Sequence, residues 1–142
     1  MKKSKRIAAL IAAVLMTVTM FTSAMTVSAA TKSKSATIKC AGYNSRCSLT
    51  SANNRSAKAS TVCFVHKYPS IYAAILCAKY NKNTDKTTYV SSAPKEATNA
   101  YSSGEASMSA PSSAAEYYAN IVSMHAVKEG SNEQGTSLDV HW

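Results

Sequence analysis

Apolar and polar residues alternate in several short segments of this chain, a period that is typical of β-strands. The clearest segments are residues 37–40, 46–49 and 136–142, in which every second residue is apolar. Residues 42–45 (Gly-Tyr-Asn-Ser) provide turn residues between the first two segments. The pattern therefore predicts a β-hairpin near the start of the folded region and a strand at its end.

The middle of the chain holds two apolar segments with different signals. Residues 61–65 (TVCFV) are β-branched and aromatic, and they predict a central strand. Residues 71–80 (IYAAILCAKY) permit two interpretations, because their alanines and their i, i+3, i+4 spacing suit a helix. Their short length and the turn signals on both sides, at residues 69–70 and 81–85, favour a strand, which is our expectation.

The remaining segments complete the pattern of an all-β chain. We expect a polar loop at residues 51–60, a strand at 86–90 and weak edge strands at 99–103 and 105–110. A last hairpin is expected from residues 116–128 and 136–142, joined by residues 129–135. Short strands separated by turn signals predict a small antiparallel β-sandwich with a C-terminal β-hairpin.

The N-terminal 30 residues have the organisation of a secretory signal peptide. Four basic residues precede an uncharged run over residues 7–30, and this run ends in small residues. An uncleaved membrane anchor is the alternative, since 24 uncharged residues can span a bilayer. Several Thr and Ser residues dilute the second half of the run, so we expect cleavage. The expected domains are a signal peptide (1–30), a polar tail (31–36) and a single secreted β domain (37–142), with no transmembrane segment in the mature chain.

All four cysteines follow the signal peptide, at Cys40, Cys47, Cys63 and Cys77. An even number in a small exported domain predicts two disulfides, for which three connectivities exist. Pairing of neighbours across hairpins, Cys40 with Cys47 and Cys63 with Cys77, is one of them. Free buried thiols are the alternative, whereas a four-thiolate metal site lacks the usual C-x2-C spacing.

Charge is distributed unevenly along the chain of 142 residues, whose formal net charge is +9. Residues 31–90 contain ten Lys or Arg residues and one acidic residue, whereas residues 91–142 contain two basic and six acidic residues. Such asymmetry suggests contact with an acidic partner. The alternative is that the two halves interleave in one sandwich and mix their charges on its surface.

Tyrosine interleaves with the basic residues of the first half and offers rigid, amphipathic contact area. Together these side chains predict a basic and aromatic binding face, built from Lys39, Tyr43, Arg46, Arg55, Lys58, Lys67, Tyr68, Lys79, Tyr80 and Lys82. The alternative is that the tyrosines are ordinary strand residues that stabilise a sheet.

Signals for catalysis and metal binding are weak. Residues 92–95 fit the S-x-x-K pattern, but Pro94 opposes the helix on which that motif works. Glycosidase chemistry needs a pair of carboxylates, and Glu105 and Glu116 are the only plausible pair, although both lie in weakly predicted segments. A final hairpin centred on residue 133 would place His125 opposite His141, a weak site for zinc or copper, although an exposed cross-strand pair is our expectation.

We therefore expect no enzyme activity and no cofactor. The expected function is that of a secreted cationic binding protein acting at an anionic cell-envelope or host surface. Its expected partner is an anionic cell-wall polymer, a lipid surface or an extracellular protein, and nucleic acid is not expected, since the chain has no recognised binding motif. A bacteriocin-like antibacterial protein and a self-associating extracellular matrix protein are the alternatives.

Overall fold

The computed structural model describes residues 30–63, 70–93, 95–97 and 103–142, and every regular element in these ranges is a β-strand. The all-β fold class is confirmed for this part of the chain, while the expected signal peptide lies outside it except for Ala30. The strands are β1 (Thr31–Cys40), β2 (Tyr43–Ala52), β3 (Ser56–Cys63), β4 (Ser70–Asn81), β5 (Lys86–Ser91), β6 (Lys95–Ala97), β7 (Ser103–Met108), β8 (Glu116–Glu129) and β9 (Asn132–His141).

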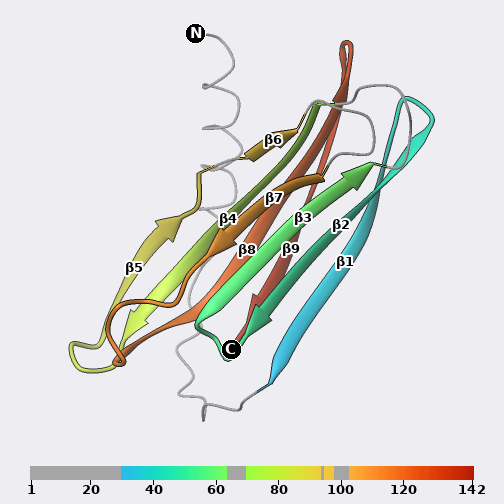
Figure 1. Ribbon diagram of the computed structural model, residues 1–142. Helices are drawn as coiled ribbons and strands as arrows, with labels where there is room; N and C mark the ends of the chain where they lie inside the picture. The colour runs from blue at the N-terminus through green and yellow to red at the C-terminus, as the bar shows by residue number, and fades with distance from the viewer. Residues whose placement is uncertain (1–29, 64–69, 94, 98–102) are drawn as a thin grey trace, which may run out of the picture.

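Two antiparallel sheets lie face to face, with their strands running along the long axis of the molecule (Figure 1). Sheet A has the order β1-β2-β3-β7, and sheet B has the order β5-β4-β8-β9, with β6 also paired to β4. Leu49 and Ala59 of sheet A are fully buried in one core with Ile75 and Ile121 of sheet B. Both sheets therefore contribute alternate residues to a common interior.

The first hairpin is longer and tighter than the sequence pattern predicts. Residues 31–36 are not a polar tail, because they form the first part of β1 and pair with β2 up to Ala52. The turn is residues 41–42 rather than 42–45, so that Cys40 lies opposite Tyr43. The first part of this strand consists mainly of Ser, Thr and Lys, so the sequence shows no apolar alternation there.

The next connection is also shorter than expected. Residues 51–60 are not a loop, because β2 continues to Ala52, residues 53–55 form a turn, and β3 begins at Ser56. The central strand expected at 61–65 is confirmed for residues 61–63, and the rest lies outside the described residues. Of the two weak edge strands, the second corresponds to β7, an edge of sheet A, and most of the first lies outside the described residues.

The ambiguous segment 71–80 is a strand, β4, as expected. It is apolar on both faces: Ile75 belongs to the core between the sheets, whereas Leu76 points to the other side and is still only 7% exposed. Val122 of β8, which pairs with Leu76, is also 7% exposed. A strand that is buried on both faces carries apolar residues at successive positions. Residues 71–80 therefore lack the period-two pattern, and their spacing also suits a helix. No helix long and apolar enough to cross a membrane occurs among the described residues.

The C-terminal hairpin has a different register from the one expected. Its turn is residues 130–131, and Glu129 pairs with Asn132. His125 consequently lies opposite Thr136, and His141 lies opposite Asn120. A shift by an odd number of residues moves side chains to the opposite face of a sheet. The predicted partnership of the two histidines is therefore wrong.

Candidate ligand-binding face

The face of sheet A that points away from sheet B is polar and rich in hydroxyl groups. Ile38 and Cys40 of β1 and Cys47 and Leu49 of β2 point inward and are buried in the core, and the alternation of side chains along a strand then places every second residue of both strands on the outer face. The outward residues of β1 are Thr31, Ser33, Ser35, Thr37 and Lys39, and those of β2 are Asn44, Arg46, Ser48, Thr50 and Ala52. Six of these residues carry a hydroxyl group, and we call the five nearest the cations, Ser33, Ser35, Thr37, Ser48 and Thr50, the hydroxyl lane.

Two cations stand at the turn end of this lane. Lys39 pairs with Asn44, and Thr37 pairs with Arg46, so Lys39 and Arg46 are diagonal neighbours on the outer face. Diagonal neighbours in a sheet have Cα atoms about 7–8 Å apart, within reach of one anionic group for side chains of this length. Both side chains are exposed, and neither forms an ion pair with a residue in the described part of the chain.

An open depression adjoins these cations. It is lined by Ser35, Thr37, Asn44 and Arg46, together with Ala36 and Ser45, and has a volume of about 440 Å³. Ser45 points to the core side, is 1% exposed, and its hydroxyl has no hydrogen-bond partner within the described ranges. The outer wall thus combines a guanidinium group with hydroxyl and amide groups, all of which bind phosphate or carboxylate oxygens.

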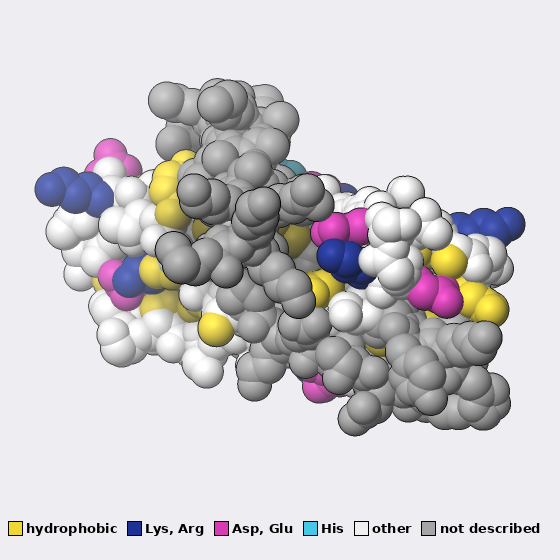
Figure 2. Space-filling model, turned by 90° about the horizontal axis from the view of Figure 1, so that it is seen from above, with side chains coloured by type: hydrophobic (Ala, Val, Ile, Leu, Met, Phe, Trp, Pro, Cys, Tyr) yellow, Lys and Arg dark blue, Asp and Glu magenta, His cyan; other side chains and the backbone are white. Residues whose placement is uncertain are grey.

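Other cations of the basic half are neutralised by acids of the acidic half. Lys58 Nζ lies 3.1 Å from Glu105 Oε2, and Lys79 Nζ lies 3.1 Å from Glu116 Oε1. Lys34 makes a third such contact, 3.4 Å from an oxygen of Asp139. Figure 2 shows basic and acidic side chains next to one another on the viewed face. The interleaving of the two halves is therefore confirmed for these pairs, and Glu105 and Glu116 do not form a carboxylate pair.

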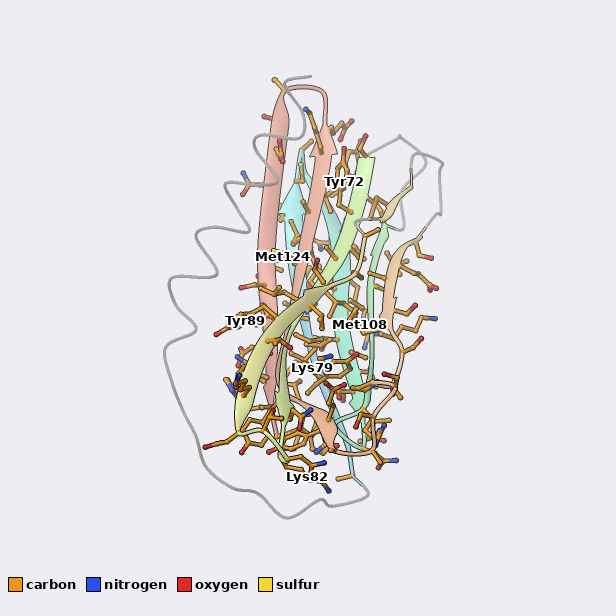
Figure 3. All side chains as sticks on the ribbon, turned by 90° about the vertical axis from the view of Figure 1, so that its left-hand side faces the viewer. Tyr72, Lys79, Lys82, Tyr89, Met108 and Met124 are labelled. Atoms are coloured by element: carbon orange, nitrogen blue, oxygen red, sulfur yellow. The ribbon has the colours of Figure 1, made fainter. Side chains whose placement is uncertain are left out.

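The expected basic and aromatic face does not form one surface. Lys39, Arg46 and Lys58 share the outer face of sheet A, but Lys79 and Lys82 lie at the far end of the molecule from the β1–β2 turn (Figures 1 and 3). That end is where β4 turns into β5. The strand register, which the sequence does not reveal, therefore separates the cations of sheet A from Lys79 and Lys82.

The remaining members of that set serve local contacts or lie elsewhere. Arg55 donates hydrogen bonds to the carbonyl oxygens of Pro111 and Ser113, at 2.8 and 3.2 Å, and so anchors the segment before β8. Tyr80 donates a 2.7 Å hydrogen bond to Asp85, which raises the pKa of its phenol. Tyr43, which is 37% exposed, sits beside the β1–β2 turn. Residues 67 and 68, also expected in this face, lie outside the described residues.

The two histidines lie on opposite faces of sheet B. His141 is exposed on the outer face, where its Nε2 atom lies 2.8 Å from Asp139 Oδ2. His125 faces the core and is 1% exposed. The weak metal site considered for this pair is therefore excluded by the strand register, and no metal-binding cluster of His, Cys, Asp or Glu occurs in the described ranges.

His125 instead belongs to a buried polar network that the sequence does not predict. Its Nδ1 atom lies 2.7 Å from the Thr61 hydroxyl, and its Nε2 atom lies 2.8 Å from the Ser123 hydroxyl. Burial lowers the pKa of the imidazole to about 4, because the charged form would lose its hydration. The Ser123–His125 contact resembles a nucleophile with its base, but both side chains are enclosed in the core and cannot meet a substrate.

All four cysteines, each within the described residues, are free and buried. The expected Cys40–Cys47 pair does not form, since Cys47 lies opposite Ala36, four positions from Cys40 along β1. Four strand positions correspond to about 13 Å, well beyond the Cα separation of a disulfide. The expected pairing of Cys63 with Cys77 across a hairpin does not occur either, because the two residues lie in different sheets. Cys63 is in β3 of sheet A, and Cys77 of sheet B pairs with Ile121.

Comparisons with known proteins do not assign this chain to a group. No family model matches it, and neither a curated protein nor a solved structure matches it. The functional argument therefore rests on the geometry described above.

Proposed function

We propose that this chain is a secreted, non-enzymatic binding protein that attaches to an anionic cell-envelope or host surface through the outer face of sheet A. The observation that carries the proposal is the position of Lys39 and Arg46 on neighbouring strands of one exposed face, with no acidic partner in the described part of the chain. Unpaired cations of this kind attract anionic partners over about 10 Å at moderate salt.

The shape of the face supports binding rather than catalysis. Small-molecule sites usually bury most of their ligand in a concave, largely apolar pocket. The depression beside Arg46 is open and lined mostly by polar residues, and the surrounding outward positions of β1 and β2 form a hydrogen-bonding surface. An extended polymer can lie across such a surface and contact several residues along it.

The first test is co-sedimentation of the purified protein with intact cells at low and at high salt. Attachment through Lys39 and Arg46 predicts binding at low salt that falls steeply as salt increases. The double variant Lys39→Gln/Arg46→Gln should lose most of this binding. The double variant Lys82→Gln/Lys86→Gln removes the same charge at the opposite end of the molecule and should retain it.

Two outcomes would overturn this proposal. Binding that persists unchanged at high salt would exclude an electrostatic attachment. Equal loss in both double variants would show that net charge, rather than this face, controls binding. A viability count on the same cells distinguishes attachment from killing, which is the property expected of the bacteriocin-like alternative.

A further inference from the structure

We infer that the ligand of this face is a polyol phosphate polymer, a chain in which phosphodiester groups alternate with hydroxylated carbon units. The inference rests on the proposed function and names the chemical class of its ligand. It derives from the juxtaposition of the hydroxyl lane with Lys39 and Arg46, which only the strand register produces.

The hydroxyl lane offers hydrogen bonds that a purely cationic patch would lack. Ser35 pairs with Ser48, and Ser33 pairs with Thr50, so that hydroxyl groups stand next to each other on adjacent strands. Ser48 is also hydrogen-bonded to Ser60 of β3, at 2.9 Å between the two oxygens, which fixes its orientation. Hydroxyl groups both donate and accept, so this lane matches a ligand that itself carries hydroxyl groups.

The lane continues directly into the cationic end. Thr37 lies between Ser35 and Lys39 along β1, and it pairs with Arg46. Outward residues of one strand repeat about every 6.8 Å, and adjacent strands are about 4.8 Å apart. A polymer that follows β1 can therefore place an anionic group between Lys39 and Arg46 and a hydroxylated unit against Thr37 and Ser35.

The composition of the face argues against two other ligand classes. The outward positions of β1 and β2 include no aromatic side chain, so a neutral sugar ring has no surface on which to stack. Their only apolar side chain is that of Ala52, so the face has no group that would insert into a lipid bilayer. The combination of cations with hydroxyls favours a water-soluble, hydroxylated polyanion.

Direct binding measurements with three polymers test this inference. Poly(glycerol phosphate) carries both phosphate and polyol units, inorganic polyphosphate carries only phosphate, and dextran carries only hydroxyls. The purified protein should bind poly(glycerol phosphate) more tightly than polyphosphate of equal charge and should not bind dextran. Lys39→Gln/Arg46→Gln should abolish binding to both phosphate polymers.

A second variant isolates the contribution of the hydroxyl lane. Ser35→Ala/Thr37→Val removes two hydroxyls without changing charge, and should weaken poly(glycerol phosphate) binding about tenfold while leaving polyphosphate binding unchanged. Thr87→Val/Ser91→Ala makes the same chemical changes on β5 of sheet B and should have no effect. Unchanged thermal unfolding of both variants shows that the fold is retained.

The outcomes distinguish this inference from the proposed function. Equal affinity for the two phosphate polymers, with no effect of Ser35→Ala/Thr37→Val, would show recognition of charge alone and overturn the inference. Salt-sensitive cell attachment without binding to either phosphate polymer would also overturn it, while the proposed function would stand. Loss of both cell attachment and polymer binding by the wild-type protein would reject both.

Discussion

The Nδ1 atom of His125 in sheet B lies 2.7 Å from the hydroxyl of Thr61 in sheet A, and this contact joins the two sheets inside the core. Thr61 donates its own proton to the carbonyl oxygen of Tyr72 at 2.8 Å, so it accepts from His125. Burial lowers the pKa of His125 to about 4, so at neutral pH the imidazole is neutral with its proton on Nδ1, and its Nε2 atom accepts from the Ser123 hydroxyl.

This network predicts that the protein loses stability in moderate acid. The pKa of His125 is about 4 in the folded protein, against 6.5 for the free side chain. Between these values the unfolded chain binds the additional proton, so the contribution of His125 is complete above pH 6.5 and is lost as the pH falls to about 4. The expected loss is at most about 3 kcal/mol. Urea unfolding at several pH values in this window measures it.

The variant His125→Gln provides the control for this pH dependence. It removes the titrating group, so its free energy of unfolding should vary less between pH 6.5 and 4 than that of the wild type. Identical pH profiles for the two proteins would contradict the assignment to His125.

Removal of the Thr61 hydroxyl should destabilise the fold. Thr61→Val preserves the shape of the side chain but leaves the Nδ1–H group of His125 without its acceptor in the core. An unsatisfied buried donor costs about 1–3 kcal/mol, and urea unfolding at neutral pH measures this loss. Thr37→Val makes the same change at an exposed position of β1 and should alter stability by less than about 0.5 kcal/mol. Equal effects of the two substitutions would contradict the structural role of the Thr61–His125 contact.

The cysteines should behave as protected thiols. Burial raises the pKa of Cys77 to about 12, and burial raises that of Cys47 to about 11 despite a hydrogen bond with Thr61. Reaction with a thiol reagent at pH 8 should therefore be slow in the folded protein and should reach four thiols per chain in denaturant without reductant. Detection of thiols only after reduction would show that disulfides form.

The turn between β1 and β2 offers a stabilising substitution. Ala41 has a φ of +48° and Gly42 a φ of +86°, so both residues are in the left-handed region. Two-residue turns of this kind prefer Asn followed by Gly, and Ala41→Asn should stabilise the protein by about 0.5–1 kcal/mol. Thermal unfolding checks this value.

The neighbouring glycine gives the opposite control. A Cβ atom at Gly42 would meet no other atom within 4 Å, so the destabilisation expected for Gly42→Ala comes from backbone conformation alone. Stabilisation by this second substitution would contradict the assigned turn.

The sequence predicted secondary structure well where local signals agreed and poorly where they were weak. The strand at 86–90 and the turn before it were recognised, because β-branched residues followed a cluster of turn residues. The sequence does not predict a strand at residues 31–36, since Thr and Ser occupy its outward positions and Lys occupies two of its inward ones, so it shows little apolar alternation. The core network was missed because Thr61 and Ser123 look like ordinary strand residues, and only packing of the two sheets brings them to His125.

By itself, the sequence determined that this chain forms antiparallel strands, because side-chain branching, period-two alternation and turn residues act on neighbouring positions. The tertiary structure decided the registers, and with them the face on which each side chain lies. An odd shift in the last hairpin moved His125 into the core and left His141 outside, and pairing of the basic with the acidic half neutralised Lys58 and Lys79 but not Lys39 or Arg46. Register depends on turn length and on packing between strands that are distant in the sequence. Local sequence patterns do not indicate either of these.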